Sequence, residues 1–183
     1  HACAMVWESL LEEEEHAVAK RDKAPQFLST HPQSEGRAEN LRALAESYGY
    51  PGRQGFVDRH ALALSSQYLN FMEDQIDTNR YGRTEFMLDR HESLGVRPGL
   101  VEFFRGEMYR QRAEEGDAEL ARSAYERAVE SGECPSACYR NLGYIQLKAK
   151  DLAAAQENFR RYLDAEPEAT DREMIEFYLA EEP

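Results

Sequence analysis

The sequence has few basic residues, few cysteines and no long hydrophobic run, and each shortage excludes a class of protein. Its 183 residues contain 22 lysines and arginines against 35 aspartates and glutamates, so the net charge is −13. This acidic balance argues against partners such as nucleic acids and anionic lipid surfaces, because both require concentrated positive charge. No apolar run approaches the roughly 20 residues that a membrane-spanning helix needs. We therefore expect no nucleic-acid binding and no membrane insertion.

The three cysteines, Cys3, Cys134 and Cys138, are too few for a disulfide framework. Cys134 and Cys138 are four residues apart, whereas a redox centre favours the C-x-x-C spacing and a zinc ribbon needs a second pair. We expect the two to be small packing residues. A disulfide or a shared metal is the alternative.

No complete catalytic or metal-binding motif is present. The H-E-x-x-H motif, which places two zinc-binding imidazoles on one helix face, does not occur. The segment His91–Gly95 begins like it, but Gly95 stands where the second histidine belongs. The sequence also lacks G-x-S-x-G, Walker and dinucleotide-binding loops. We therefore predict no catalytic residue, no metal ligand and no cofactor within this chain.

Apolar residues recur at helical spacing along the chain, and no segment alternates like a strand, so we predict an all-α protein. Helices are expected over 3–20 and 35–48, separated by a segment that Pro25 and Pro32 interrupt. A stretch rich in glycine and proline over 48–55 marks a candidate domain boundary. We expect one domain over 1–50 and a domain of helical repeats over 56–183.

The clearest repeat covers residues 136–169 and matches the tetratricopeptide (TPR) pattern. The matching residues are Tyr139, Leu142, Gly143, Ala155, Phe159 and Pro167. The glycine lets two helices approach closely, and the phenylalanine fills the space between repeats. Gln146 and Tyr162 depart from the residues usual at their positions.

The same pattern recurs one unit earlier, with three extra residues in the turn between its helices. The residues concerned are Gly106, Tyr109, Ala121, Tyr125 and Ala128. A weaker unit over 68–88 and a polar closing helix over 170–180 complete the prediction, a TPR-like solenoid of about three helix pairs plus a capping helix. Residues 151–183 carry a net charge of −7. We attribute this charge to the solvated face of the closing helix, with an acidic docking face as the alternative.

The first helices of the repeats carry aromatic and basic residues that would line the concave face of a solenoid. These are Arg105, Tyr109, Arg112, Arg140, Tyr144 and Lys148. Aromatic area combined with positive charge suits acidic or extended peptides, so we predict a partner-binding face. The alternative is an ordinary helix surface.

The segment Phe27-Leu-Ser-Thr-His31-Pro32, followed by Arg37 and Leu41, resembles part of the BepA- and HtpX-like zinc metallopeptidases. In that family the segment lies C-terminal to the catalytic core. Residues 4–11 resemble the helix after the third zinc ligand, and the repeats after residue 56 resemble the TPR region of BepA-like members. The resemblance implies that this chain is the non-catalytic C-terminal part of such a peptidase, whose H-E-x-x-H helix would lie upstream of residue 1.

The resemblance also implies a function. The parent protein would be a zinc metalloendopeptidase of the bacterial periplasm or envelope, and this part would dock substrate or partner proteins in outer-membrane protein quality control. In this family a histidine of the segment is thought to approach the zinc and restrain activity, and the resemblance gives that regulatory role to His31 alone. We expect His31 to be exposed or loosely packed. We expect Trp7, Leu10 and Leu11 to pack either on the repeats or on a second copy of the chain. The second arrangement would give a homodimer. The alternative function is a stand-alone TPR scaffold for protein–protein interaction.

Overall fold

The computed structural model describes residues 8, 12, 35–48, 67–93, 95 and 97–180, which form eight α-helices and no strand. The helices are α2 (Glu35–Ser47), α4 (Tyr68–Asp77), α5 (Tyr81–Ser93), α6 (Pro98–Arg112), α7 (Asp117–Glu130), α8 (Ser136–Lys148), α9 (Leu152–Ala165) and α10 (Arg172–Leu179). The all-α prediction is confirmed. None of the helices described is long and apolar enough to cross a membrane. The chain divides into two compact units, residues 1–89 and 90–183.

The first unit contains α2, α4 and most of α5. In α2, Arg42 forms an ion pair with Glu8. Met72 and Ile76 are the buried residues of α4. In α5 the buried Thr84 accepts a hydrogen bond from the amide nitrogen of Gln75 in α4, at 3.3 Å. His31, the predicted first helix apart from Glu8 and Glu12, and residues 49–55 of the predicted boundary lie outside the described residues.

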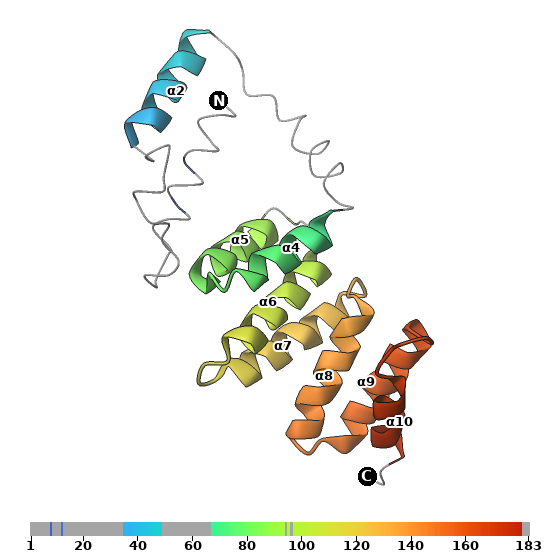
Figure 1. Cartoon of the computed structure of the whole chain (residues 1–183). Helices are drawn as coiled ribbons and strands as arrows, with labels where there is room; N and C mark the ends of the chain where they lie inside the picture. The colour runs from blue at the N-terminus through green and yellow to red at the C-terminus, as the bar shows by residue number, and fades with distance from the viewer. Residues whose placement is uncertain are drawn as a thin grey trace. The chain divides into compact units, whose positions relative to one another are not determined.

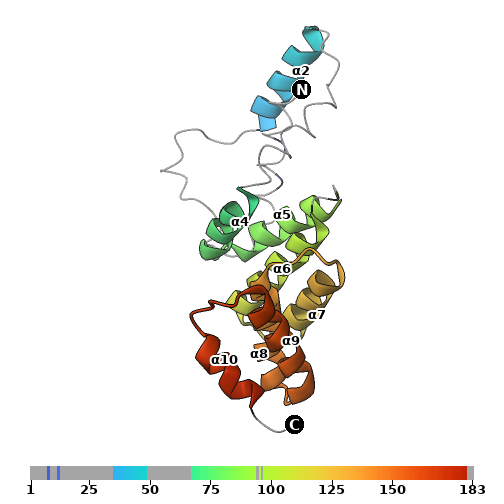
Figure 2. The ribbon, with the colours of Figure 1, turned by 90° about the vertical axis from the view of Figure 1, so that its right-hand side faces the viewer.

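In the second unit, α6 to α10 pack in chain order, each against the next (Figure 1). Figure 2 shows the same succession from the side. Large apolar side chains, among them Phe104, Met108 and Phe159, are fully buried between these helices. The α6–α7 and α8–α9 pairs are therefore consecutive helical hairpins, and α10 closes the series.

Local sequence explains where these helices begin and end. Pro98 lies in the first turn of α6, where its missing N–H leaves no hydrogen bond unmade. Ala113 ends α6 in the left-handed conformation, with φ of 53°. Asp151 caps α9 by accepting a hydrogen bond from the Ala154 amide at 3.3 Å. Proline and capping residues thus divide the chain into the helices that pack together.

Each of the two hairpins packs an aromatic ring directly over a glycine. A Cβ on Gly106 would lie 2.6 Å from the Tyr125 ring, and a Cβ on Gly143 would lie 2.6 Å from the Phe159 ring. Real Cβ atoms do not approach carbon this closely, so both positions require glycine at these helix separations. The two hairpins therefore share one internal packing arrangement.

A polar network joins the first hairpin to the second. The Glu107 carboxylate of α6 accepts hydrogen bonds from the Tyr125 hydroxyl of α7 and from the Asn141 amide of α8. The same carboxylate also accepts a hydrogen bond from Arg110 Nη2 at 2.5 Å. Burial, followed by the nearby Glu107 charge, raises the pKa of Tyr125. The hydroxyl therefore stays protonated and remains a donor that ties α7 to α6.

The closing helix, predicted over 170–180, is α10. Its residue Ile175 is fully buried, and Tyr178 and Leu179 pack against the same core. The solvent side contains Glu173 but also Phe177, which is 65% exposed. The predicted polar outer face therefore includes an exposed aromatic side chain.

Candidate protein-interaction surfaces

The six predicted partner-binding residues lie on α6 and α8, and we call them the first-helix face. The side chain of Arg105 is only 10% exposed. Its Nη2 lies 2.7 Å from Glu92 Oε2, and its Nε lies 3.7 Å from Glu102 Oε1. This guanidinium is therefore held inside the fold by two carboxylates.

Arg112 and Tyr109 lie at the end of α6, and their contacts stabilise the turn that leads to α7. Arg112 forms two hydrogen bonds to Asp117, at 2.9 and 2.6 Å, and its guanidinium carbon lies 5.1 Å from the centre of the Tyr109 ring. Asp117 is 2% exposed and also accepts the Glu114 backbone N–H at 2.8 Å. The Arg112 hydrogen bonds, more than any other contact, lower the pKa of Asp117. The carboxylate is charged at neutral pH and fixes both ends of the turn.

The remaining first-helix residues lie on α8. Arg140 Nη1 is 3.5 Å from Asp171 Oδ2, and the same guanidinium lies over the Tyr162 ring at 5.6 Å. The Tyr144 ring packs edge-on against Phe159, with centroids 5.2 Å apart. Its buried hydroxyl has no hydrogen-bond partner among the described residues. Lys148, at the end of α8, is exposed. Partner binding by this face stays a prediction, and most of its side chains also hold the fold together.

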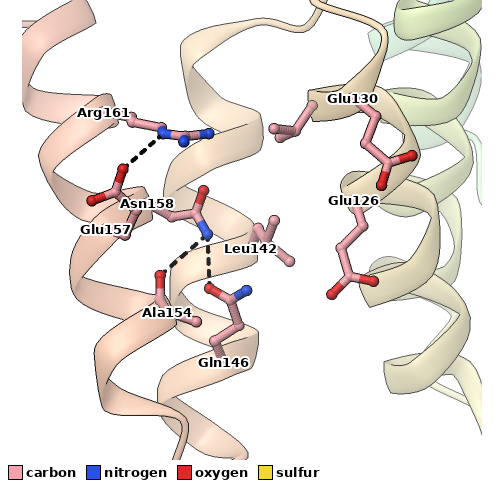
Figure 3. A pocket seen from close by; sticks show the side chains of 9 residues that line it. Glu126, Glu130, Leu142, Gln146, Ala154, Glu157, Asn158 and Arg161 are labelled. Carbon is pink, nitrogen blue, oxygen red and sulfur yellow. Dashed lines mark hydrogen bonds and ion pairs between the residues drawn. The ribbon is translucent and has the colours of Figure 1, made fainter. Parts of the chain in front are cut away.

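A second surface lies where α7, α8 and α9 meet, and we call it the second-helix groove (Figure 3). Its volume is about 260 Å³. Its lining residues are Glu126, Val129 and Glu130 from α7, Leu142 and Gln146 from α8, and Ala154, Glu157, Asn158 and Arg161 from α9. The groove therefore spans both hairpins.

The floor of the groove combines apolar side chains with a pair of amides. Asn158 donates through Nδ2 to Gln146 Oε1 at 2.8 Å and to the Ala154 carbonyl at 3.2 Å. Both amide side chains belong to buried residues. Leu142 lies beside them and is itself buried (Figure 3), and the half-buried Val129 and Ala154 supply the accessible apolar surface. The floor can thus contact an apolar side chain.

The rim of the groove is charged and carries an excess of carboxylates. Glu126 pairs with Arg122 at 2.8 Å, and Glu157 pairs with Arg161 at 3.2 Å. Glu130, an exposed residue, makes no ion pair with any residue that the structure describes. The rim can therefore attract a positive charge.

One residue of this groove stands out in the sequence as a departure from the TPR pattern. Gln146 departs from the residue usual at its position in the TPR pattern, and it is the residue that holds Asn158. Tyr162 departs likewise, and its hydroxyl donates to Asp171 at 2.8 Å. Both departures introduce polar contacts between elements.

Cys134 and Cys138 are free thiols, and Cys138 is buried whereas Cys134 is half-buried. Across 35–48, 67–93 and 97–180, no group of three or more His, Cys, Asp and Glu side chains is arranged to hold a metal ion.

Comparison with models of protein families, with curated proteins and with solved structures finds no match to this chain. The functional proposal therefore rests on the contacts of α6 to α10 and on the sequence patterns.

Proposed function

We propose that residues 98–180 form a TPR-like helical repeat module that binds a segment of another protein. The observation that carries this proposal is the glycine–ring contact that recurs in both hairpins, at Gly106 with Tyr125 and at Gly143 with Phe159. Glycine and aromatic residues at these two positions are what the TPR pattern specifies. Stacked repeats of this kind present surfaces that cross several helices and bind extended partners.

The second-helix groove is the docking surface of the module, and its occupant is a basic, amphipathic segment. Glu130 offers a carboxylate that forms no ion pair with another described residue, and it lies beside the half-buried apolar side chains of Val129 and Ala154. The whole chain carries a net charge of −13, which further favours a cationic partner. By contrast, Arg105 and Arg112 of the first-helix face already pair with carboxylates of this chain.

A fluorescein-labelled amphipathic peptide of leucine and lysine tests this surface by fluorescence anisotropy. The Glu130→Lys substitution should weaken binding about five- to tenfold, which corresponds to about 1 kcal/mol for an exposed charge. The matched control is Glu115→Lys, because Glu115 is an exposed residue of the α6–α7 turn and lies outside the groove. Equal weakening by both substitutions would mean attraction to the net charge alone and would contradict the groove.

The chain is, in this proposal, the non-catalytic C-terminal part of a BepA/HtpX-like zinc metallopeptidase of the bacterial envelope. The segment Phe27–Pro32 with Arg37 and Leu41 supports this part of the proposal. The module would hold substrate or partner proteins for a catalytic core that carries the zinc. An H-E-x-x-H motif in the reading frame before residue 1 is the expected finding. Zinc-dependent cleavage of casein by residues 1–183 alone would contradict it.

A stand-alone TPR scaffold is the second candidate function. It uses the same module and differs only in lacking a peptidase core. An upstream reading frame without H-E-x-x-H would favour it. Binding of an amphipathic leucine–glutamate peptide, weakened by Lys148→Glu, would instead place the partner on the first-helix face.

A further inference from the structure

The two amide side chains on the floor of the second-helix groove hold each other in one orientation. Asn158 of α9 donates through Nδ2 to the Ala154 carbonyl at 3.2 Å, and a carbonyl oxygen can only accept a hydrogen bond. The amide nitrogen of Asn158 must therefore face Ala154. The same nitrogen donates to Gln146 Oε1 of α8 at 2.8 Å, so the Gln146 amide turns its oxygen toward Asn158. Both orientations are thus set by contacts within the chain.

These contacts leave one acceptor and one donor of the amide pair unused. Asn158 Oδ1 and Gln146 Nε2 form no hydrogen bond with any residue that the structure describes. Asn158 is 8% exposed and Gln146 is 5% exposed, so each residue is more than nine-tenths buried. Both side chains line the groove, and Figure 3 shows the Gln146 nitrogen on the side of its amide that faces away from Asn158. A nearly buried polar atom without a partner is unfavourable, and a ligand that supplies the partner removes that disadvantage.

An unused acceptor beside an unused donor matches the backbone of an extended peptide. A residue of an extended segment can offer its N–H and its C=O to the same neighbour, as paired residues of an antiparallel sheet do. Asn158 Oδ1 would accept the N–H, and Gln146 Nε2 would donate to the C=O. A helical segment cannot do this along most of its length, because its N–H and C=O groups bond to one another.

The rest of the groove suits the side chains of an extended segment. Successive side chains of such a segment point in opposite directions, so they can reach the parts of the groove that α7 and α9 contribute. The half-buried Val129 of α7 and Ala154 of α9 offer apolar contact. The exposed Glu130 carboxylate can attract a basic side chain. Backbone contacts to the amide pair and side-chain contacts beside it can therefore act together.

We propose that the Gln146–Asn158 amide pair binds the backbone of an extended segment of the partner protein. Asn158 Oδ1 accepts an N–H of that segment, and Gln146 Nε2 donates to one of its C=O groups. This contact rests on the proposed docking function and adds to it the conformation of the bound segment. The partner residue at this point needs a backbone N–H, so proline is excluded there.

Backbone ester scanning of a short leucine–lysine peptide tests the contact on the full chain. The peptide carries fluorescein and a single central leucine flanked by lysines, so that it binds in one register. An ester in place of an amide removes one N–H and keeps the size of the backbone. Fluorescence anisotropy should show about tenfold weaker binding for the ester at one position, because a nearly buried acceptor then lacks its donor, and smaller effects elsewhere.

Two substitutions of equal size separate peptide binding from a structural role. Asn158→Leu and Asn158→Asp both remove the hydrogen bonds that Asn158 donates to Gln146 and Ala154, so a merely structural role would make the two variants behave alike. Only the aspartate keeps an acceptor oxygen. The ester effect at the sensitive position should persist in Asn158→Asp and disappear in Asn158→Leu, with circular dichroism confirming that each variant folds. If Asn158→Leu does not fold, the ester scans of the original chain and of Asn158→Asp still decide.

The outcomes separate the amide contact from the docking function. Binding that Glu130→Lys weakens but that an ester weakens at no position would overturn the amide contact alone. An ester effect of equal size in Asn158→Leu and in the original chain would also overturn it. Absence of binding, or binding that Glu130→Lys leaves unchanged, would overturn the docking surface and the amide contact with it.

Discussion

At the scale of single residues, the separation of paired helices depends on glycines that face aromatic rings. The ring of Phe159 lies 2.6 Å from the position that a Cβ on Gly143 would take, and Phe159 is itself fully buried. A buried ring has little room to move in a close-packed core. The glycine is therefore needed for its missing side chain, and its backbone remains ordinary helix.

We predict that Gly143→Ala lowers the free energy of unfolding by about 1–2 kcal/mol, because the cost of overpacking exceeds the gain in helix propensity. Urea denaturation measures the change. Phe159→Leu should be less damaging in the Gly143→Ala background than in the original chain, since the smaller side chain makes room for the methyl group. Gly36→Ala in α2 is the control, because a Cβ there lies within 4 Å of no residue that the structure describes, and it should not destabilise the protein.

Ala113, which ends α6, is an alanine in a conformation that favours glycine. Its φ is 53°, and Gly116 in the same turn has φ of 87°. We predict that Ala113→Gly stabilises the chain by about 0.5–1 kcal/mol and that Gly116→Ala destabilises it by about 1 kcal/mol. Thermal denaturation should show opposite shifts for the two variants. Shifts in the same direction would contradict the backbone explanation, because a Cβ on Gly116 meets no neighbour within 4 Å.

At the scale of elements, the turn between α6 and α7 is held by the buried carboxylate of Asp117. Arg112 and the Glu114 amide both donate to it. We predict that Asp117→Asn lowers the free energy of unfolding by about 2–3 kcal/mol at pH 7, since a charged hydrogen-bonded pair is lost in a partly enclosed site.

This contribution should depend on pH. The pKa of Asp117 in the folded chain is lowered, chiefly by the Arg112 hydrogen bonds. The stabilisation is therefore fully present above the ordinary aspartate pKa of about 3.9 and is lost as the pH falls through the lowered value. Urea denaturation of the original chain and of the Asp117→Asn variant should show that the difference between their free energies of unfolding becomes smaller in acid. Glu114→Gln is the control, because the Glu114 side chain is 69% exposed and its pairing should contribute well under 1 kcal/mol.

The sequence was sufficient to predict the order of the elements in the second unit. The three extra residues are expected in the turn between the helices of the earlier repeat unit, and the structure has that turn at 113–116, between α6 and α7. Gly143 and Phe159 were recognised because close approach leaves few residue choices at such positions. The partners of the arginines were not predictable in this way. Arg140 can either bind another protein or pair with Asp171 of this chain. The ion pair with Asp171 depends on how α10 packs against the hairpins, and helical periodicity does not contain that information.

At the scale of the whole molecule, the second unit has two surfaces that differ in how their charged side chains are paired. The first-helix face supplies arginines and Tyr144 to internal ion pairs and to the aromatic core. The second-helix groove crosses both hairpins and keeps an exposed carboxylate at Glu130. Most of the net negative charge of residues 151–183 lies outside α9 and α10, at residues such as Asp151, Glu166, Glu168 and Asp171.

The most direct test is nuclear magnetic resonance mapping on the ¹⁵N-labelled chain, titrated with the amphipathic leucine–lysine peptide. The account predicts that backbone shifts concentrate at residues 126–130 of α7 and 154–161 of α9, with little change at residues 105–112 of α6. Shifts concentrated at 105–112, with little change at 126–130 and 154–161, would place the partner on the first-helix face. That result would contradict the groove as the docking surface.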